Sequence, residues 1–516
     1  MAQITQPASL ATTDRRVYDV RLQIVVTDQR LALGLLGLLL GASVLVAFLS
    51  KSTYDSGDGI FHYLIARYVP QHPDNLLNPW AKPFFTLLAT LPAQGGYLGM
   101  KLFQCGVVAL SAWLAFVVAR ALKLPFPFLA VVFCYAAPDY FRIQLSGLTE
   151  PLFGLVLIGS VALAASRRPG WSAALVTWLP FVRSEGFILL GIWVVYLLWN
   201  RSWRVLPLLG LGYAVYSVVG GWLLGDYGWV FGGNPYGLHS QYGSGRWTHF
   251  LEHLPTLLGW GLLALFVLGG LNIVWRMFRK ATWAQPLFRV DLLLVYGSIV
   301  VFVAAHSIFW ALGLFGSFGM TRVLTVLTPL FAVAAVRGLA WASQLTPRPA
   351  VRRWLAVGTV AGLVVLLFGP DRGFSTDNGG FMGHHSTLHW RRDLQQSTDL
   401  ALADEAVAWF KQHEPNWRWH PIAFEHTYYA AALDADLFDP AIRVPLTKNW
   451  QPDLDAVPVG TYIFWDGWFC PVEGHLPLAM LQKDGRFKQL WRGTIPMDRG
   501  NPTGETYKAV ILQKVR

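Results

Sequence analysis

Long apolar segments, separated by short polar stretches, dominate the chain up to about residue 369. Residues 31–50 carry no charged side chain, and about 20 such residues let a helix cross the hydrocarbon core of a membrane. The pattern predicts about eleven transmembrane helices. They lie near 31–50, 97–119, 125–141, 148–165, 171–182, 186–199, 205–224, 257–275, 290–313, 321–341 and 353–369. The fifth and sixth are short and are equally consistent with a tilted hairpin.

The pattern changes after residue 369, where charged residues return and apolar runs shorten. Residues 399–413 show the spacing of an amphipathic helix, and 459–465 and 507–512 read as strands. We therefore expect an α-helical polytopic membrane protein with a small C-terminal α/β domain. Its expected parts are an N-terminal segment over 1–30, a transmembrane domain over 31–369 with outer loops at 51–96 and 225–256, and the C-terminal domain over 370–516.

Composition supports a membrane protein and argues against nucleic-acid binding. Hydrophobic residues make up 54% of the 516 residues and charged ones only 14%, whereas soluble proteins contain about 25% charged residues. The net charge is +11, but the cations stand between apolar runs and form no basic face. That distribution is typical of topology signals.

Lys and Arg are more frequent in the segments on the side of the N-terminus, so we expect this end in the cytoplasm. An odd number of spans then places the C-terminal domain outside. No eukaryotic retention signal is present, which favours a bacterial inner membrane.

Acidic residues give a sharper signal than the cations. Between residues 31 and 369 there are nine, and eight of them fall on the outer side of this topology. A charge at the centre of a span costs roughly 2.5–3.5 kcal/mol, so charges gathered at one margin indicate a polar cavity there. The eight are Asp55, Asp58, Asp74, Asp139, Glu150, Glu185, Asp226 and Glu252. Of these, Asp74 and Glu252 are expected to be ordinary loop residues.

The first outer loop holds two carboxylates and an imidazole within eight residues, namely Asp55, Asp58 and His62. If 59–69 is helical, His62 lies one turn from Asp58. A carboxylate placed there can accept the proton of an attacking hydroxyl. The structural alternative is that Asp58 caps the helix that begins at Gly59.

Several cations near the same margin are candidates to bind phosphate. Lys82 precedes an apolar segment, where its ammonium could reach a lipid phosphate; the alternative is a snorkelling lysine. Arg142, close to Asp139, is a candidate phosphate clamp, and Glu150 could orient it or bind a sugar. Arg183 and Glu185 stand between two apolar runs, where they either bind substrate or neutralise each other.

The loop at 225–250 is rich in glycine and aromatic residues and also contains Arg246. Its aromatic rings either stack on a sugar or form an interfacial aromatic belt. His384, His385 and His389 lie together but lack a recognised ligand spacing, so we expect no metal site there. Whether the reaction uses a divalent cation is not determined by the sequence. No nucleotide-binding fingerprint is present.

Taken together, these elements resemble the GT-C superfamily of membrane glycosyltransferases. The likeness rests on the acidic cluster after the first span, Lys82-Pro83 before the second, Leu148-Thr149-Glu150-Pro151-Leu152-Phe153, and Arg183-Ser184-Glu185-Gly186. It covers roughly residues 30–345. The superfamily includes protein O-mannosyltransferases, GPI mannosyltransferases and aminoarabinose transferases.

This resemblance implies a sugar donor on a polyprenyl or dolichyl phosphate and an active site on the outer face. It implies an Asp or Glu of the first loop as catalytic base. Many members carry two adjacent carboxylates there, whereas here Gly59 follows Asp58, and Asp55 precedes it by three positions. We favour Asp58 over Asp55. Lys82 fits the position at which aminoarabinose transferases contact the donor phosphate, and a C-terminal extracytoplasmic domain is frequent in the family.

The expected function is therefore transfer of a sugar from a polyprenyl-phosphate donor to an acceptor hydroxyl, with inversion at the anomeric carbon. Asp58 and Asp55 are the candidate catalytic residues. The candidate substrate-binding residues are Lys82, His62, Asp139, Arg142, Glu150, Arg183, Glu185 and Arg246. A flippase of lipid-linked sugars is the main alternative, but it predicts charges near mid-membrane and on both sides. A non-catalytic scaffold would not need the acidic cluster.

Overall fold

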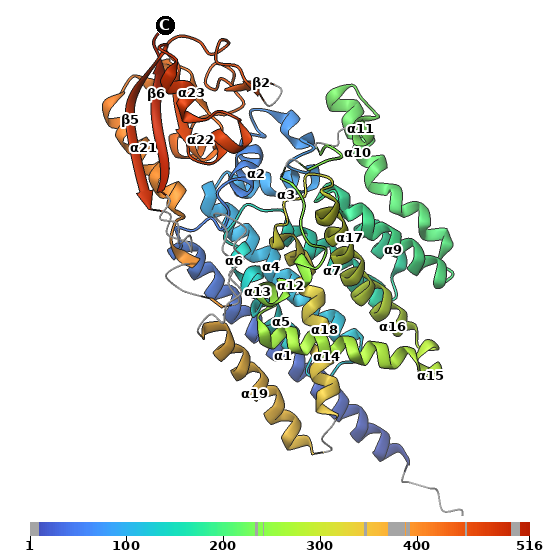
Figure 1. Cartoon of the computed structure of the whole chain (residues 1–516). Coiled ribbons are helices and arrows are strands. Elements are labelled where there is room, and N and C mark those ends of the chain that lie inside the picture. Colours follow the sequence, from blue (N-terminus) through green and yellow to red (C-terminus); the bar gives the residue numbers. More distant parts are fainter. Residues whose placement is uncertain are drawn as a thin grey trace, which may run out of the picture.

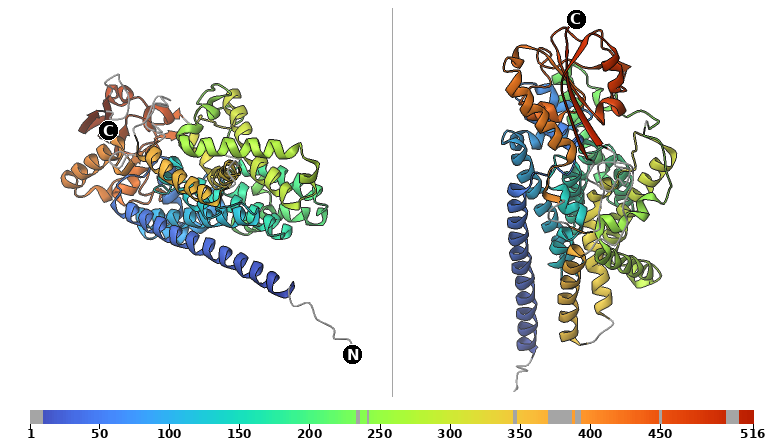
Figure 2. Two further views of the ribbon diagram at one scale, coloured as in Figure 1. Left: turned by 90° about the horizontal axis from the view of Figure 1, so that it is seen from below. Right: turned by 60° about the vertical axis from the view of Figure 1, so that its left-hand side comes forward.

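The computed structural model describes residues 10–232, 236–240, 242–344, 348–369, 387–388, 393–448, 451–496 and 506–516. A bundle of helices carries the C-terminal sheet domain at one end (Figure 1). The first helix, α1 (Leu10–Leu49), runs along the side of the bundle, and its N-terminal end points away from that domain (Figure 2). His384, His385 and His389 lie outside the described residues.

The first half of the bundle consists of helices joined by short connections. After α1 these are α2 (Asp58–Arg67), η1 (Pro73–Leu77), α3 (Pro83–Ala93), α4 (Gly96–Ala121), α5 (Leu129–Tyr135), α6 (Pro138–Ile143), α7 (Glu150–Ala165), α8 (Pro169–Val176), η2 (Leu179–Phe181), α9 (Gly186–Trp199), η3 (Trp203–Gly210) and α10 (Leu211–Leu224).

The second half continues the bundle to residue 368. Its elements are α11 (Trp229–Gly232), α12 (His249–Glu252), α13 (Leu254–Leu258), α14 (Trp260–Met277), α15 (Lys280–Trp283), α16 (Pro286–Arg289), η4 (Val290–Gly297), α17 (Ser298–Leu312), η5 (Thr321–Leu327), α18 (Thr328–Ser343) and α19 (Pro349–Phe368).

Among the described residues, seven helical stretches are long and apolar enough to cross a membrane. They are Thr27–Leu49, Gly96–Ala121, Trp203–Leu224, Trp260–Met277, Pro286–Leu312, Thr321–Ser343 and Ala350–Phe368. Three shorter apolar helices, α3, α7 and α9, accompany them. The predicted spans 125–141 and 171–182 are each broken near a proline, Pro138 or Pro180, into two short helices. The protein is thus an integral, multi-pass membrane protein.

Helix α18 lies at the centre of the bundle and is almost entirely buried. It packs against α14 at a distance that leaves no room for side chains at two glycines. A Cβ atom on Gly338 would lie 1.9 Å from the carbonyl oxygen of Leu265, and one on Gly269 would lie 2.2 Å from that of Ala334. Small residues let helix backbones approach closely within a membrane, so these glycines fix the α14–α18 contact.

The C-terminal region is the expected small α/β domain. Its elements are α21 (Thr398–His413), η6 (Trp417–Trp419), β1 (Ile422–Phe424), α22 (Tyr428–Leu433), β2 (Thr447–Lys448), β3 (Gln451–Pro452), β4 (Tyr462–Asp466), η7 (Phe469–Glu473), α23 (Leu478–Lys483), β5 (Phe487–Pro496) and β6 (Thr506–Lys514). The main sheet has the order β1-β4-β6-β5, in which only β1 and β4 are parallel. Helix α21 packs on β5 and β6, and the predicted helix and both predicted strands are confirmed.

This domain rests on the polypeptide that follows α1. Helices α2 and α22 lie side by side (Figure 1). An Arg67 nitrogen lies 2.5 Å from an Asp434 carboxylate oxygen, and His72 Nε2 lies 2.8 Å from Asp436 Oδ2. The first loop of the bundle is therefore held between the helices and the C-terminal domain.

Candidate functional site

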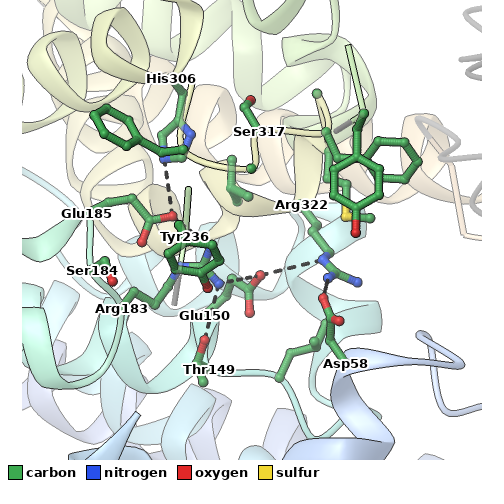
Figure 3. Close-up of a pocket in the computed structure, with 18 of the residues that line it drawn as sticks. Asp58, Thr149, Glu150, Arg183, Ser184, Glu185, Tyr236, His306, Ser317 and Arg322 are labelled. Atoms are coloured by element: carbon green, nitrogen blue, oxygen red, sulfur yellow. Dashed lines mark hydrogen bonds and ion pairs between the residues drawn. The ribbon is translucent and has the colours of Figure 1, made fainter. Parts of the chain in front are cut away.

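A cavity of about 630 Å³ opens where the C-terminal domain meets the helices, and Figure 3 shows residues that line it. Seven separate parts of the chain line it: the loop after α1 with the start of α2, the turn before α3, the start of α7, the turn before α9, the segment that carries Tyr236, Tyr242 and Phe250, the segment from α17 to η5, and residues 468–473 of the C-terminal domain. Charged residues concentrate on the bundle side of the cavity, and aromatic rings surround them.

Asp55 and Asp58 have different environments within this cavity. One Asp55 carboxylate oxygen accepts hydrogen bonds from the backbone N–H groups of Gly57 (3.1 Å) and Gly59 (2.7 Å). Its side chain is only 2% exposed, whereas that of Asp58 is 45% exposed. Asp55 therefore makes the capping contacts that were the structural alternative for Asp58, and the Asp58 carboxylate is accessible from the pocket.

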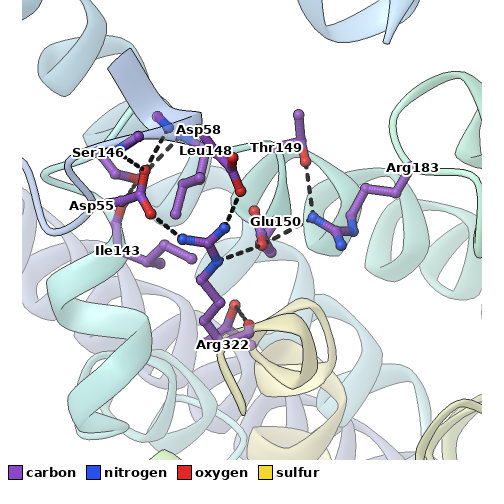
Figure 4. A network of polar contacts seen from close by, with 12 residues as sticks. Asp55, Asp58, Ile143, Ser146, Leu148, Thr149, Glu150, Arg183 and Arg322 are labelled. Carbon is purple, nitrogen blue, oxygen red and sulfur yellow. Dashed lines mark hydrogen bonds and ion pairs between the residues drawn. The ribbon is translucent and has the colours of Figure 1, made fainter. Parts of the chain in front are cut away.

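Arg322 joins these two carboxylates to a third one. Its guanidinium pairs with Asp55 and Asp58, and its Nε lies 3.6 Å from Glu150 Oε1 (Figure 4). The side chain is buried at the start of η5. Sequence analysis missed this residue as a site residue, although a single arginine at the margin of an otherwise apolar span is the signal that marks it.

Glu150 also pairs with Arg183, which extends the network along the pocket wall. Arg183 lies 2.9 Å from both Glu150 and Glu185, and His306 Nε2 lies 3.9 Å from Glu185 (Figure 3). Burial raises the pKa of Glu185, but the charges of Arg183 and His306 outweigh this effect and bring the pKa down to about 2. Arg183 and Glu185 thus neutralise each other and line the cavity as well. Sequence analysis missed His306, which lies inside an apolar span.

Lys82 is the pocket cation that carries no ion pair. Its ammonium donates hydrogen bonds to the Pro79 carbonyl (2.7 Å) and the Ser184 hydroxyl (2.9 Å), and lies 5.2 Å from the centre of the Tyr236 ring. In the described part of the chain no carboxylate pairs with it. Burial lowers the pKa of Lys82 to about 8. Since the side chain is buried in the pocket, it is not a snorkelling lysine at the lipid surface.

His62 lies on the predicted helix, one turn from Asp58, and is buried. Its ring stacks on Trp80, with centroids 4.6 Å apart. Burial lowers the pKa of His62 to about 3, so the imidazole is neutral at physiological pH. It contributes a flat neutral face beside the acidic cluster.

Three predicted site residues lie outside the pocket lining, namely Asp139, Arg142 and Arg246. Arg142 is buried between Asp139 (3.0 Å) and Asp393 (3.1 Å) and donates to the carbonyl of Thr387. Its charge thus anchors the segment that leads into the C-terminal domain. Arg246 is 79% exposed and lies 3.3 Å from Glu252.

The C-terminal domain supplies a wall that sequence analysis missed, made of Trp468, Phe469 and Glu473. Burial, together with the charge of Asp58, raises the pKa of Glu473 to about 7. No sequence signal connects η7 with the first loop. Among the described residues, no group of three or more His, Cys, Asp or Glu side chains is placed to hold a metal ion.

Comparison with known proteins identifies the fold. No family model and no curated protein sequence matches the chain. Two crystal structures of ArnT from Cupriavidus metallidurans do match. The apo form has 15% identity and a TM-score of 0.54 and covers 94% of this chain and 98% of ArnT. The form bound to undecaprenyl phosphate has 14% identity and a TM-score of 0.51, and the match covers 95% of this chain and 98% of ArnT. An Archaeoglobus fulgidus oligosaccharyltransferase matches at 11% identity and a TM-score of 0.47, over 91% of this chain and 73% of the oligosaccharyltransferase. The predicted GT-C fold is confirmed.

Proposed function

We propose that this GT-C-fold membrane protein transfers a sugar from a polyprenyl-phosphate donor to an acceptor hydroxyl. The observation that supports the proposal most is one cavity that contains both an accessible carboxylate, Asp58, and a cation without an ion pair, Lys82. Transfer from a sugar phosphate needs a group that accepts a proton and a group that holds the departing phosphate. A related fold with bound undecaprenyl phosphate agrees with this donor class.

In the proposed reaction, the acceptor oxygen attacks the anomeric carbon from the side opposite the phosphate. The bond from that carbon to the phosphate oxygen breaks, and its electron pair stays on the phosphate. Asp58 accepts the hydroxyl proton and later releases it to water. The products are a glycoside of inverted configuration and polyprenyl phosphate.

Arg322 and Asp55 act on Asp58 in this scheme without reacting themselves. Asp55 fixes the start of α2 through its two backbone hydrogen bonds, and Arg322 bridges the two carboxylates. A base held in a single orientation gains rate because the reacting atoms meet in the required geometry. Arg322 is therefore a positioning residue.

Lys82 is assigned the donor phosphate because the other strong cations of the pocket are already paired. Arg183 faces Glu150 and Glu185, and Arg322 faces three carboxylates. An anion entering the pocket gains most from a charge that no carboxylate neutralises. The distribution of Lys and Arg in the sequence favours the outer face of the membrane for this site, where a lipid carrier would supply the activated sugar.

The direct test is Asp58→Asn in the full-length protein, reconstituted with a polyprenyl-phosphate sugar. We expect formation of polyprenyl phosphate to fall by a factor of about 100 or more, because the variant cannot accept the proton. Asp74→Asn changes an exposed carboxylate of the same loop and is the matched control. Turnover close to that of the wild type in a folded Asp58→Asn protein would remove Asp58 from this role.

A further inference from the structure

The C-terminal domain presents a rigid loop to the pocket. The carboxylate of Asp466, at the end of β4, accepts hydrogen bonds from the backbone N–H groups of Trp468 (2.9 Å), Phe469 (2.6 Å) and Cys470 (3.2 Å). Asp466 and Cys470 are both buried. Three backbone bonds to one buried carboxylate fix the course of the chain here, so the side chains that follow have defined positions.

This loop is fastened to the part of the chain that carries Asp58. The ring of Phe469 stacks on His426, with centroids 4.3 Å apart, and His426 Nε2 lies 2.8 Å from the carbonyl oxygen of Ser56. A Cβ atom on Gly57 would lie 3.0 Å from the Phe469 ring. Phe469 therefore packs directly against the residue before Asp58.

Glu473 is the carboxyl that this loop brings into the cavity. In the described part of the chain its side chain makes no hydrogen bond and no ion pair. The strongest charges that act on it are acidic: Asp58 and Asp55 on the first loop, both of which pair with Arg322, and Asp466 and Glu425 within its own domain. The charges that act on Lys82 are different ones, Glu185 and Arg183. Glu473 thus lies in the part of the cavity that holds Asp58, whereas Lys82 lies beside the Arg183–Glu185 pair.

We propose that Trp468, Phe469 and Glu473 form the acceptor side of the pocket, and that the acceptor is a carbohydrate without negative charge near its reacting hydroxyl. This inference rests on the proposed transferase function and extends it. Aromatic rings pack against the apolar faces of sugar rings, and a carboxyl group accepts hydrogen bonds from sugar hydroxyls. Two neighbouring carboxyl groups repel a phosphate or carboxylate, which restricts the acceptor to neutral or amino-bearing sugars.

The test uses the full-length protein in lipid nanodiscs and a panel of neutral disaccharides, each paired with its monophosphate. Affinity is measured by saturation-transfer NMR. In Lys82→Ala, which lacks the cation proposed to bind phosphate, we expect neutral disaccharides to bind at least tenfold more tightly than their monophosphates. Glu473→Gln should weaken neutral binding roughly tenfold, and Trp468→Ala should weaken it further. Glu405→Gln changes an exposed carboxylate on α21 and is the matched control.

A pH series separates recognition from a purely structural role. Above about pH 7 the Glu473 carboxyl loses its proton. In the Lys82→Ala background, discrimination against the monophosphates should therefore increase more steeply with pH when Glu473 is present than when it is replaced by Gln, because titration of the phosphate itself at about pH 6 affects both proteins. Monophosphates that bind as tightly as neutral sugars in Lys82→Ala would overturn the proposal. So would a panel of which no member binds, or neutral binding that neither Glu473→Gln nor Trp468→Ala changes.

Binding of undecaprenyl phosphate, measured in the same nanodiscs, tests the donor function separately. Glu473→Gln should leave this affinity unchanged, because the charges that act on Lys82 are those of Glu185 and Arg183. If the wild type binds the disaccharides as expected but not undecaprenyl phosphate, the acceptor proposal is supported and the lipid-donor function is contradicted. If it binds only undecaprenyl phosphate, the acceptor proposal fails.

Discussion

The surroundings of Lys82 determine its charge state and its ability to bind an anion. Burial brings its pKa down to about 8, so the ammonium is charged below that pH and loses its charge as the pH rises through it. Two hydrogen bonds and the Tyr236 ring fix its position. An unpaired cation in a partly dry pocket binds an anion more strongly than the same group in water.

We expect Lys82→Ala to raise the KM for a polyprenyl-phosphate sugar tenfold or more, because the phosphate loses its charged partner. In the wild type, donor affinity should fall as the pH rises above about 8. Lys82→Arg should keep its affinity through that range, since a guanidinium stays protonated. Donor turnover at pH 7 to 9.5 is the measurement, and Lys51→Ala, an exposed lysine of the same loop, is the control. A flat wild-type profile would contradict the assignment.

Charges at the margins of apolar runs led directly to Asp58, Lys82, Glu150, Arg183 and Glu185, all of which line the pocket. The same reasoning selected Asp139, Arg142 and Arg246, which do not. Position along the chain cannot tell a charge that faces a cavity from one that anchors another segment. That distinction depends on partners such as Asp393, which pairs with Arg142 from far along the sequence.

Among the elements, the pair α14 and α18 shows most clearly how backbone geometry determines packing. Gly269 faces the carbonyl of Ala334 at a distance too short for a side chain, whereas a Cβ atom on Gly270 would meet nothing within 4 Å. Of these two consecutive glycines, Gly269 has no room for a side chain, whereas Gly270 has room for one.

We expect Gly269→Ala to lower the free energy of unfolding by about 1–3 kcal/mol, because the added methyl group separates the helices. Gly270→Ala should be neutral or stabilising, since alanine favours a helix over glycine. Thermal unfolding of both variants in the same detergent is the measurement. Equal midpoints for the two would show that α14 and α18 do not pack this closely.

Apolar runs predicted where helices lie more accurately than where they break. The long helices α4, α14 and α18 match predicted spans, since length and hydrophobicity dominate there. The run 125–141 contains Pro138, which begins the separate helix α6. A proline in a run of constant hydrophobicity can either bend a helix or end it, and only the neighbouring elements decide between these outcomes.

For the whole molecule, the decisive feature is the contact between the C-terminal domain and the first loop. Arg67, His72 and the Ser56 carbonyl each meet a residue of that domain, and Phe469 packs on Gly57. A small α/β domain could be predicted from its strands and helix, but its position on the bundle could not. That position depends on single side chains, which no periodic pattern encodes.

We expect Phe469→Ala to lower polyprenyl phosphate formation about tenfold, because Gly57 and Asp58 lose the ring that holds them in place. Binding of undecaprenyl phosphate should be retained, since Lys82 is not affected. Trp419→Ala removes an aromatic side chain of the same domain that is 86% exposed and should leave turnover unchanged. Undiminished turnover in Phe469→Ala would mean that the domain does not position the base.

The contact between His426 and Ser56 joins residues 370 positions apart in the sequence. During biosynthesis the carboxylates of the first loop therefore emerge from the ribosome long before the wall that faces them. A nascent chain that has inserted only its helices lacks the Phe469 ring against Gly57. On the proposed mechanism, such an intermediate consumes the lipid carrier more slowly than the complete protein, because the distal domain that helps to hold Asp58 has not yet docked.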